Sequence, residues 1–371
     1  MANTFATLQT IAREALPRLM ENLVFPNLVN RDFSDTYTNL GDTIQIRKPN
    51  ALSAADFSVG QAVNYADMTD STVAVTMDKI ATVDVAASAI ETAVNIDDLN
   101  RVFIEPATVA LAEKINADGL KMALEIPYAV GTPGTTPSTL AAFADARKLL
   151  NVNKAPISPR YGVWDPEADA AFTQIPSLVN AEKAGSTEAL RNGSIGRVFG
   201  IDNYMAQSVA KVESGITASN AVKVNGAVQA GATSLAIDGT SLTGKLKKGE
   251  ILTIAGHTYV VTEDTVDASS NAIAQVKVYP ALPAIKDNTD VVIAGAHTAN
   301  LVFNPYAFCF VSRPLVNPDG QGVEAYVTSY NGLSLRVVKG YDQQYKRSIY
   351  SMDILYGYKA VYPEMAVRVM G

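Results

Sequence analysis

The hydrophobic positions near the start of the chain recur at helical spacing. Steps of three and four residues place them on one face of an amphipathic helix. Pro17 interrupts this pattern and Pro26 ends it. Such a helix has little stability by itself, so we expect it to lie as an arm on a partner surface. The apolar positions of the arm are Leu8, Ile11, Ala12, Ala15, Leu19 and Leu23.

The period changes to two in residues 41–88, which predicts strands. Ile44 and Ile46 share one strand face, the alternation returns over residues 71–77, and it resumes at Val83 and Val85. The polar, small residues 50–70 between these strands form a connection too long for a tight hairpin. Connections of that length are commonly functional or disordered.

Three helices are predicted next from their start signals. Pro106 stands at the favoured first position of a helix that continues to about Glu125. Ser138 is expected to cap a second helix, which continues through Leu150. Asp165 is expected to cap a third helix, which follows a short strand and is entered by Pro166.

Helical periodicity disappears over residues 217–296, where short β-type runs alternate with turns. The sequence "AGH" between two of these runs predicts a hairpin in which Gly256 takes a positive φ. We interpret the segment as a small all-β module inserted into a host domain. The chain beyond Leu333 is again strand-like and rich in tyrosine, and it ends in the alternating residues Met365, Val367 and Val369.

Composition excludes several classes of protein. The 371 residues carry a net charge of -7 with a pI near 5.0, so no excess of basic residues indicates a nucleic-acid reader. The single cysteine, Cys309, excludes an intramolecular disulfide.

No apolar run suggests a signal peptide or a membrane helix. We expect a soluble protein made in the cytoplasm. Charged residues are only 18% of the chain, which suggests surface buried between subunits.

Two glycine-rich stretches resemble phosphate-binding loops, and both are better explained as turns. Residues 239–246, "GTSLTGKL", fail the phosphate-loop pattern at Leu246, which has no hydroxyl for magnesium. Residues 192–204, "NGSIGRVFGIDNY", follow a helix and precede a strand, the reverse of the order that directs amides at a phosphate. Arg197 is then a solvated or subunit-facing cation.

The remaining chemical candidates form no catalytic or metal-binding set. His257 and His297 have no cysteine or carboxylate at ligand spacing. Cys309 stands in an apolar strand, where a buried thiol is inert. Asp97 and Asp98 fit a polar turn or a helix start, and residues 32–42 lack calcium-loop spacing. We expect no enzyme activity, no cofactor and no metal.

The order of parts resembles the major capsid proteins of tailed double-stranded DNA phages, which have the Hong Kong 97-like fold. It is most similar to the short-tailed-phage coat proteins with an inserted β-domain. The resemblance covers nearly the whole chain. Its matching stretches are "ANTFATLQTIAREALPRLMENLVFPNLVNRDF", "GDTIQIRKP", "RYGVWDPEADAAF", "GSIGRVFGIDNYMAQSV", "LKKGEILTIAGHTYVV" and "DILYGYKAVYPEMAVRV".

The resemblance implies an α+β fold with defined parts. They are an N-terminal arm (1–40), an extended loop (41–88), a peripheral domain with the spine helix (89–139), an axial domain (140–216 and 297–350), an inserted β-domain (217–296) and a closing strand (351–371).

By this resemblance, the protein is expected to form hexamers and pentamers in an icosahedral virion capsid that encloses double-stranded DNA without reading its sequence. The implied partners are a separate scaffolding protein, a portal and a decoration protein, with assembly in the host cytoplasm and no membrane. An encapsulin-like shell around other cargo and a β-rich carbohydrate-binding protein remain alternative interpretations.

Two segments are predicted to act as straps between subunits. Neither the arm nor the extended loop has a pattern that buries its apolar residues within one chain, so each is expected to lie across a neighbour, which offsets the entropy lost on ordering. The candidate strap residues are Leu52, Phe57, Val59 and Tyr65 in the loop and Leu8 and Ile11 in the arm.

Overall fold

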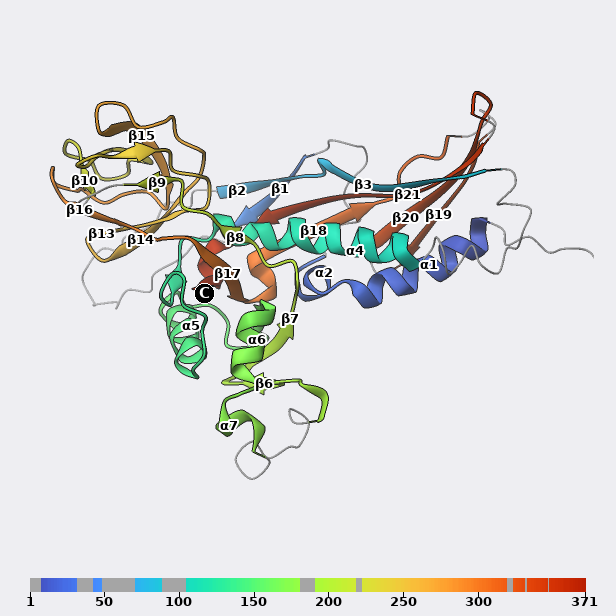
Figure 1. The fold of residues 1–371 in the computed structure, drawn as a ribbon, viewed down its shortest axis with the longest axis horizontal. Coiled ribbons are helices and arrows are strands. Elements are labelled where there is room, and N and C mark those ends of the chain that lie inside the picture. The colour runs from blue at the N-terminus through green and yellow to red at the C-terminus, as the bar shows by residue number, and fades with distance from the viewer. Residues whose placement is uncertain are drawn as a thin grey trace, which may run out of the picture.

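The computed structural model of the protein describes residues 8–31, 43–48, 71–88, 105–180, 191–217, 222–318, 323–330, 332–345 and 347–371. Figure 1 shows an elongated molecule with a long sheet, helices along that sheet, a lobe beneath it and a barrel at one end. The predicted α+β class is confirmed. Residues 32–42, the loop residues 49–70 and the pair Asp97 and Asp98 lie outside the described residues.

The long sheet is organised around one strand, β21. One edge of β21 pairs with β18 and β20, the other edge pairs with β3 along ten residues, and β19 extends the sheet beyond β20. β21 runs through residue 350 without a break. The strands are β3 (Lys79–Ser88), β18 (Phe308–Arg313), β19 (Glu324–Tyr330), β20 (Leu333–Asp342) and β21 (Arg347–Ala360).

The predicted Pro106 helix is confirmed as α4 (Glu105–Leu120), which continues as the 3-10 helix η4 (Lys121–Glu125). It lies along the long sheet together with α1 (Leu8–Asn22), and the short α2 (Phe25–Leu28) packs on it (Figure 1). A Cβ at Gly119 would stand 2.5 Å from the ring of Phe25, so only glycine permits this approach of α2 to α4.

The arm is the first correction to the sequence interpretation. Its apolar residues from Ala12 onward are buried in the largest core of their own chain, against α4 and the long sheet. The arm is expected from its sequence pattern to need a neighbouring subunit to bury its apolar face. For the residues from Ala12 onward this expectation is wrong, because their own chain buries them. Local pattern could not reveal the burial because β19 and β20, which α1 contacts, lie about 300 residues later in the chain. α1 also runs through Pro17.

A second sheet of seven strands carries the lower lobe of Figure 1. Helices α5 (Ala141–Val152) and α6 (Pro166–Phe172) share one core with it. A further short helix, α7 (Pro176–Val179), follows. The strands are β4 (Ala129–Val130), β5 (Tyr161–Trp164), β6 (Arg197–Val198), β7 (Ile201–Met205), β8 (Lys211–Val212), β17 (His297–Phe303) and β22 (Ala366–Met370).

Of the two predicted caps in this lobe, one is confirmed and one is wrong. The Asp165 side chain accepts a hydrogen bond from the Ala168 amide at 3.3 Å and begins α6 as expected. Ser138 does not cap α5, because the helix starts three residues later, at Ala141, and its N-cap residue is Leu140, which makes no side-chain cap. The residue type of Ser138 favours a cap, but residue type alone does not determine where the helix begins.

Strands between residues 222 and 293 form a closed barrel with its own apolar core. The predicted hairpin is confirmed, with Ala255 and Gly256 at φ values of 50° and 81° between paired strands. Strands β9 (Ile216–Thr217) and β12 (Thr243–Gly244) pair beside the barrel. The barrel strands are β10 (Val222–Val224), β11 (Ser234–Asp238), β13 (Ile251–Ile254), β14 (His257–Val261), β15 (Ala272–Tyr279) and β16 (Asp290–Ile293).

The base of the predicted extended loop is a two-stranded ladder of β1 (Thr43–Lys48) and β2 (Ser71–Thr76). Ile46 and Val75 from this ladder pack with Leu355 of β21 in a small separate core. Two 3-10 turns, η5 (Pro305–Ala307) and η6 (Pro363–Met365), complete the elements. None of the helices in the described ranges is long and apolar enough to cross a membrane.

Candidate assembly site

The structure gives turns at both stretches that resemble phosphate loops. Leu246, at the end of residues 239–246, is fully buried in the barrel core. The next element after this stretch is strand β13 and not the helix that a phosphate loop requires. Gly193, Gly196 and Gly200 all take positive φ, and Gly200 lies in the tight turn between β6 and β7. Arg197 lies 3.6 Å from Asp202 on the surface. Both turn interpretations are confirmed.

The candidate chemical residues stand apart in the fold. His257 is exposed on the barrel, whereas His297 is buried and its Nδ1 lies 2.7 Å from the Gly295 carbonyl oxygen. Cys309 is buried in β18 as predicted. Within the described ranges, no group of three or more histidine, cysteine or carboxylate side chains could hold a metal ion.

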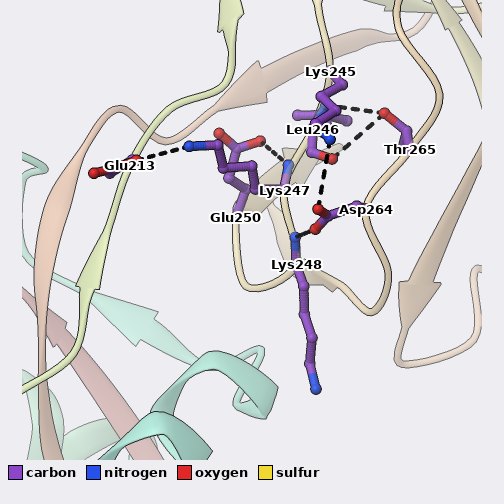
Figure 2. A network of polar contacts seen from close by, with 8 residues as sticks. All are labelled: Glu213, Lys245, Leu246, Lys247, Lys248, Glu250, Asp264 and Thr265. Atoms are coloured by element: carbon purple, nitrogen blue, oxygen red, sulfur yellow. Dashed lines mark hydrogen bonds and ion pairs between the residues drawn. The ribbon is translucent and has the colours of Figure 1, made fainter.

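The most developed polar network joins the barrel to the rest of the chain (Figure 2). The Glu250 carboxylate is fully buried and accepts hydrogen bonds from the backbone amides of Gly215 at 2.8 Å and Lys247 at 3.2 Å. Burial raises the pKa of Glu250, and these hydrogen bonds oppose that rise. Glu250 therefore fastens the segment that enters the barrel to a loop of the barrel.

Charged side chains continue this junction toward the body. Lys247 reaches Glu213 at 2.7 Å, and Lys248 reaches Glu125 of η4 at 3.0 Å. In Figure 2 the Lys248 side chain extends away from the other labelled residues. Lys359 of β21 lies 4.0 Å from the other oxygen of Glu125. Glu125 thus stands between a cation of the barrel and a cation of the long sheet.

Arg368 of β22 is the buried centre of the same junction. Its guanidinium is fully buried and donates hydrogen bonds to the carbonyl oxygens of Ala123, Ile126 and Gly249. Burial lowers its pKa to about 9, so it stays charged at neutral pH. Three parts of the chain, the end of the spine helix, the barrel and the closing strand, meet at this one side chain.

Sequence reasoning missed Arg368, Glu250 and Glu125. A usable signal existed for Arg368, since a single charged residue in the apolar strand "AVRVM" must find polar partners once that strand is buried. No comparable signal marked Glu250, because it stands in the polar turn "LKKGE".

A cavity of about 440 Å³ lies beside the junction, where β2, the end of η4, the barrel and β21 meet. Val73 brings the base of the predicted extended loop to this cavity. The base of the loop, the barrel and the end of the spine helix therefore meet at one end of the long sheet.

The predicted strap residues are only partly located. Leu8 and Ile11 lie in the first turns of α1, before the buried stretch that begins at Ala12. Leu52, Phe57, Val59 and Tyr65 lie outside the described residues. Their strap role stays a prediction.

The fold is that of phage capsid proteins. A structure from Mycobacterium phage Che8 is 17% identical, with a TM-score of 0.54 over 94% of this chain and 90% of that chain. The mature capsid of bacteriophage PhiM1 is 10% identical, with a TM-score of 0.50 over 94% of this chain and 86% of that chain. The architecture therefore belongs to the Hong Kong 97-like class of capsid folds.

A sequence match narrows this class. Residues 241–371 match the family described as P22 coat protein, gene protein 5. No curated relative matches the chain. The family match and the shared fold together support a major capsid protein of the tailed-phage type, and neither alternative interpretation is favoured.

Proposed function

We propose that this protein is the major capsid protein of a tailed phage and assembles, as hexamers and pentamers, into a closed icosahedral shell. The observation that carries the proposal is the capsid fold over 94% of the chain, joined to the coat-protein match over residues 241–371. Contacts in such rings are head to tail, so the angle between subunits determines whether the shell closes.

The proposed role is structural and without turnover chemistry, since the histidines, Cys309 and the carboxylates of the described chain form no nucleophile–base or metal-binding set. The shell is assembled in the host cytoplasm and becomes part of the virion. A scaffolding protein, a portal and a decoration protein are its proposed partners.

The division into arm, extended loop, peripheral domain, axial domain and inserted β-domain also belongs to this proposal. The barrel supports it for residues 217–296, since its strands close on a core of their own. The buried face of α1 restricts the arm's strap role to residues before Ala12. The loop strap keeps its four candidates, Leu52, Phe57, Val59 and Tyr65.

The enclosed double-stranded DNA is held without being read. The chain is acidic, with a net charge of -7, and its sequence has no pattern of a basic recognition helix, whereas sequence readers need contacts to base edges. Titration of short duplexes with purified subunits tests this part of the proposal. Binding that is tight and depends on sequence would contradict it.

Sedimentation and electron microscopy of the purified chain, with and without a scaffolding protein, test the whole proposal. The expected result is particles far heavier than one 39.4 kDa chain, seen as rings and closed shells. A chain that stays monomeric at high concentration under both conditions would overturn it.

A further inference from the structure

Two short connections join the barrel to the body, by which we mean the described residues before 213 and after 296. The entry connection, residues 213–214, follows β8, and the exit connection, residues 295–296, precedes β17. β8 pairs with β17, and their register places Val212 opposite His297. The last body residue before the barrel and the first body residue after it are therefore direct neighbours in one ladder, at the end of the molecule where Figure 1 shows the barrel.

The barrel-side ends of both connections are fastened within the barrel. The Gly215 amide donates a hydrogen bond to the buried Glu250 carboxylate at 2.8 Å. The Ala294 amide donates to the Ile251 carbonyl oxygen at 2.9 Å. Any movement of the barrel as one body is then confined to the two connections, which act together as one hinge because they lie side by side.

The barrel and the body do not share an apolar core in the described chain. The barrel core contains buried residues between 222 and 291, and the partly buried apolar residues around it lie between 216 and 293. The described residues of the three other cores all lie outside that range. Relative movement is the ordinary behaviour of two domains that no large apolar interface joins.

The contacts that hold the barrel against the body are polar. We name three of them the barrel latch: Gly249–Arg368 at 2.6 Å, Lys248–Glu125 at 3.0 Å and Tyr279–Glu364 at 3.4 Å. Each of these groups bonds water when its partner moves away, and the guanidinium of Arg368 regains the hydration that burial removes. Opening the latch therefore exchanges one set of hydrogen bonds for another.

The interface between the barrel and the body also leaves space. The cavity of about 440 Å³ has Lys248, Val260 and Tyr279 on its barrel side and Leu124 and Lys359 on its body side. A close-packed protein interior leaves few voids larger than a water molecule. Packing at this interface therefore does not restrict the barrel to one orientation.

We propose that the barrel pivots as one body about residues 213–214 and 295–296, and that the barrel latch selects the orientation in this structure. When the latch opens, the barrel moves away from η4 and β21, and water replaces the lost partners. The role of this pivot in a shell rests on the proposed function. Rings of five and of six copies place one chain at two angles to its neighbours, and a hinged barrel follows that change without repacking a core.

Spin-label distances in the unassembled full chain test the pivot directly. Labels at Lys286→Cys on the barrel and Glu113→Cys on α4 occupy exposed positions, and Cys309 stays unlabelled because it is only 1% exposed. Lys248→Glu places a like charge against Glu125. It should raise the population of a second distance about fivefold, the change expected when one exposed ion pair is reversed.

Lys277→Glu is the matched control for this reversal. Lys277 is also a half-exposed lysine of the barrel, 49% exposed against 48% for Lys248, but its ion pair with Glu263, at 2.8 Å, lies within the barrel. The control variant should keep the distance distribution of the wild type. A second population of equal size in both reversal variants would overturn the assignment of the latch.

Gly295→Ala tests the position of the hinge. A Cβ at residue 295 would lie 4.0 Å from the nearest atom, on Pro133, so the variant leaves the present orientation unstrained and restricts the backbone of the exit connection. Added to Lys248→Glu, it should lower the second population about twofold without lowering the melting temperature. Gly340→Ala, where an added Cβ meets no atom within 4 Å in the long sheet, is the control and should change neither.

The outcomes separate the pivot from the proposed function. One unchanged distance in both the wild type and Lys248→Glu overturns the pivot, whether or not a shell forms. A second distance in Lys248→Glu, together with a wild-type chain that never assembles, overturns the shell and leaves the pivot standing. If the wild type assembles, Gly295→Ala should form fewer closed shells than Gly340→Ala. Equal assembly of these two variants would overturn the role of the pivot in shell closure.

Discussion

The Tyr356 hydroxyl donates a hydrogen bond to Asp118 at 2.9 Å, joining the long strand β21 to the spine helix across 238 residues of chain. Lys114 and Lys121 also lie 3.1 Å from the Asp118 carboxylate. Burial acts to raise the pKa of Asp118, but the hydrogen bonds from Lys121, Tyr356 and Lys114 outweigh it and hold the pKa below its ordinary value. This cluster fixes α4 on the sheet.

Tyr356→Phe should destabilise the chain by about 1–2 kcal/mol, since a buried hydrogen bond to a charged group is lost. Because the pKa of Asp118 is lower in the folded chain, its carboxylate contributes fully to the free energy of unfolding above the pKa of an unfolded aspartate, about 4. It is lost as the pH falls through the lower folded value. Urea unfolding at neutral pH and near pH 3 should therefore show a smaller effect of the substitution in acid. Tyr345→Phe, at an exposed ring, is the control, and an equal loss in both variants would contradict the prediction.

Arg368→Met should destabilise the chain by about 2–6 kcal/mol, because it leaves the buried carbonyl oxygens of Ile126 and Gly249 without their donor, at about 1–3 kcal/mol each, whereas the Ala123 carbonyl keeps the Ile126 amide. Arg368→Lys keeps the charge but cannot reach all three oxygens, so its loss should be intermediate. Chemical unfolding measures both, with Lys286→Ala as the exposed control. Near-wild-type stability of Arg368→Met would show that the junction does not depend on this side chain.

His297 should make the protein less stable in mild acid. Burial lowers the pKa of His297, and the positive charge of Arg368 lowers it further. The hydrogen bond with the Gly295 carbonyl raises the pKa but does not cancel this decrease. The unfolded chain binds a proton near pH 6.5 while the folded chain resists it, so this contribution is complete above pH 6.5 and falls by up to about 1.4 kcal/mol per pH unit below it.

The measurement is the free energy of unfolding between pH 7.5 and 5 for the wild type, His297→Gln and His257→Gln. The change of the unfolding free energy with pH should be smaller in His297→Gln than in the wild type. It should stay unchanged in His257→Gln, where the substituted ring is exposed. Equal slopes in all three chains would assign the acid sensitivity to other groups.

Deleting residues 51–70 should prevent or weaken shell closure while leaving the melting of the isolated chain nearly unchanged. The base of the loop packs through Ile46 and Val75 on β21, outside the deleted segment. The effect should therefore appear in sedimentation and micrographs before it appears in circular dichroism. Unfolding of the isolated shortened chain would place the loop in the core and contradict the strap assignment.

The barrel should fold alone, and better with its entry segment attached. A fragment of residues 217–296 should give dispersed amide spectra, since the barrel strands close on their own core. A fragment of residues 213–296 should be more stable by about 1–3 kcal/mol, because it keeps the Gly215 amide that bonds the buried Glu250. A random-coil spectrum from both fragments would contradict independent folding.

Several elements could be predicted from sequence because their determinants lie within a few residues. Asp165 caps α6 through the amide of Ala168, three residues away. The Ala255–Gly256 turn joins strands that pair directly across it. Helix α4 begins where Pro106 predicted it, and the apolar run around Cys309 became a buried strand. The architecture as a whole came from the resemblance in the order of these parts.

Tertiary structure alone decided which surfaces these elements cover. The apolar face of α1 predicted a helix but not its partner, which proved to be α4 and the long sheet of the same chain. The carbonyl oxygens that accept hydrogen bonds from Arg368 lie up to 245 residues away in the chain. The Gly215 amide that donates to Glu250 lies 35 residues away. Periodicity records that a side chain will be buried, but it carries no information about which distant segment supplies the covering atoms, because that depends on how the sheets pack.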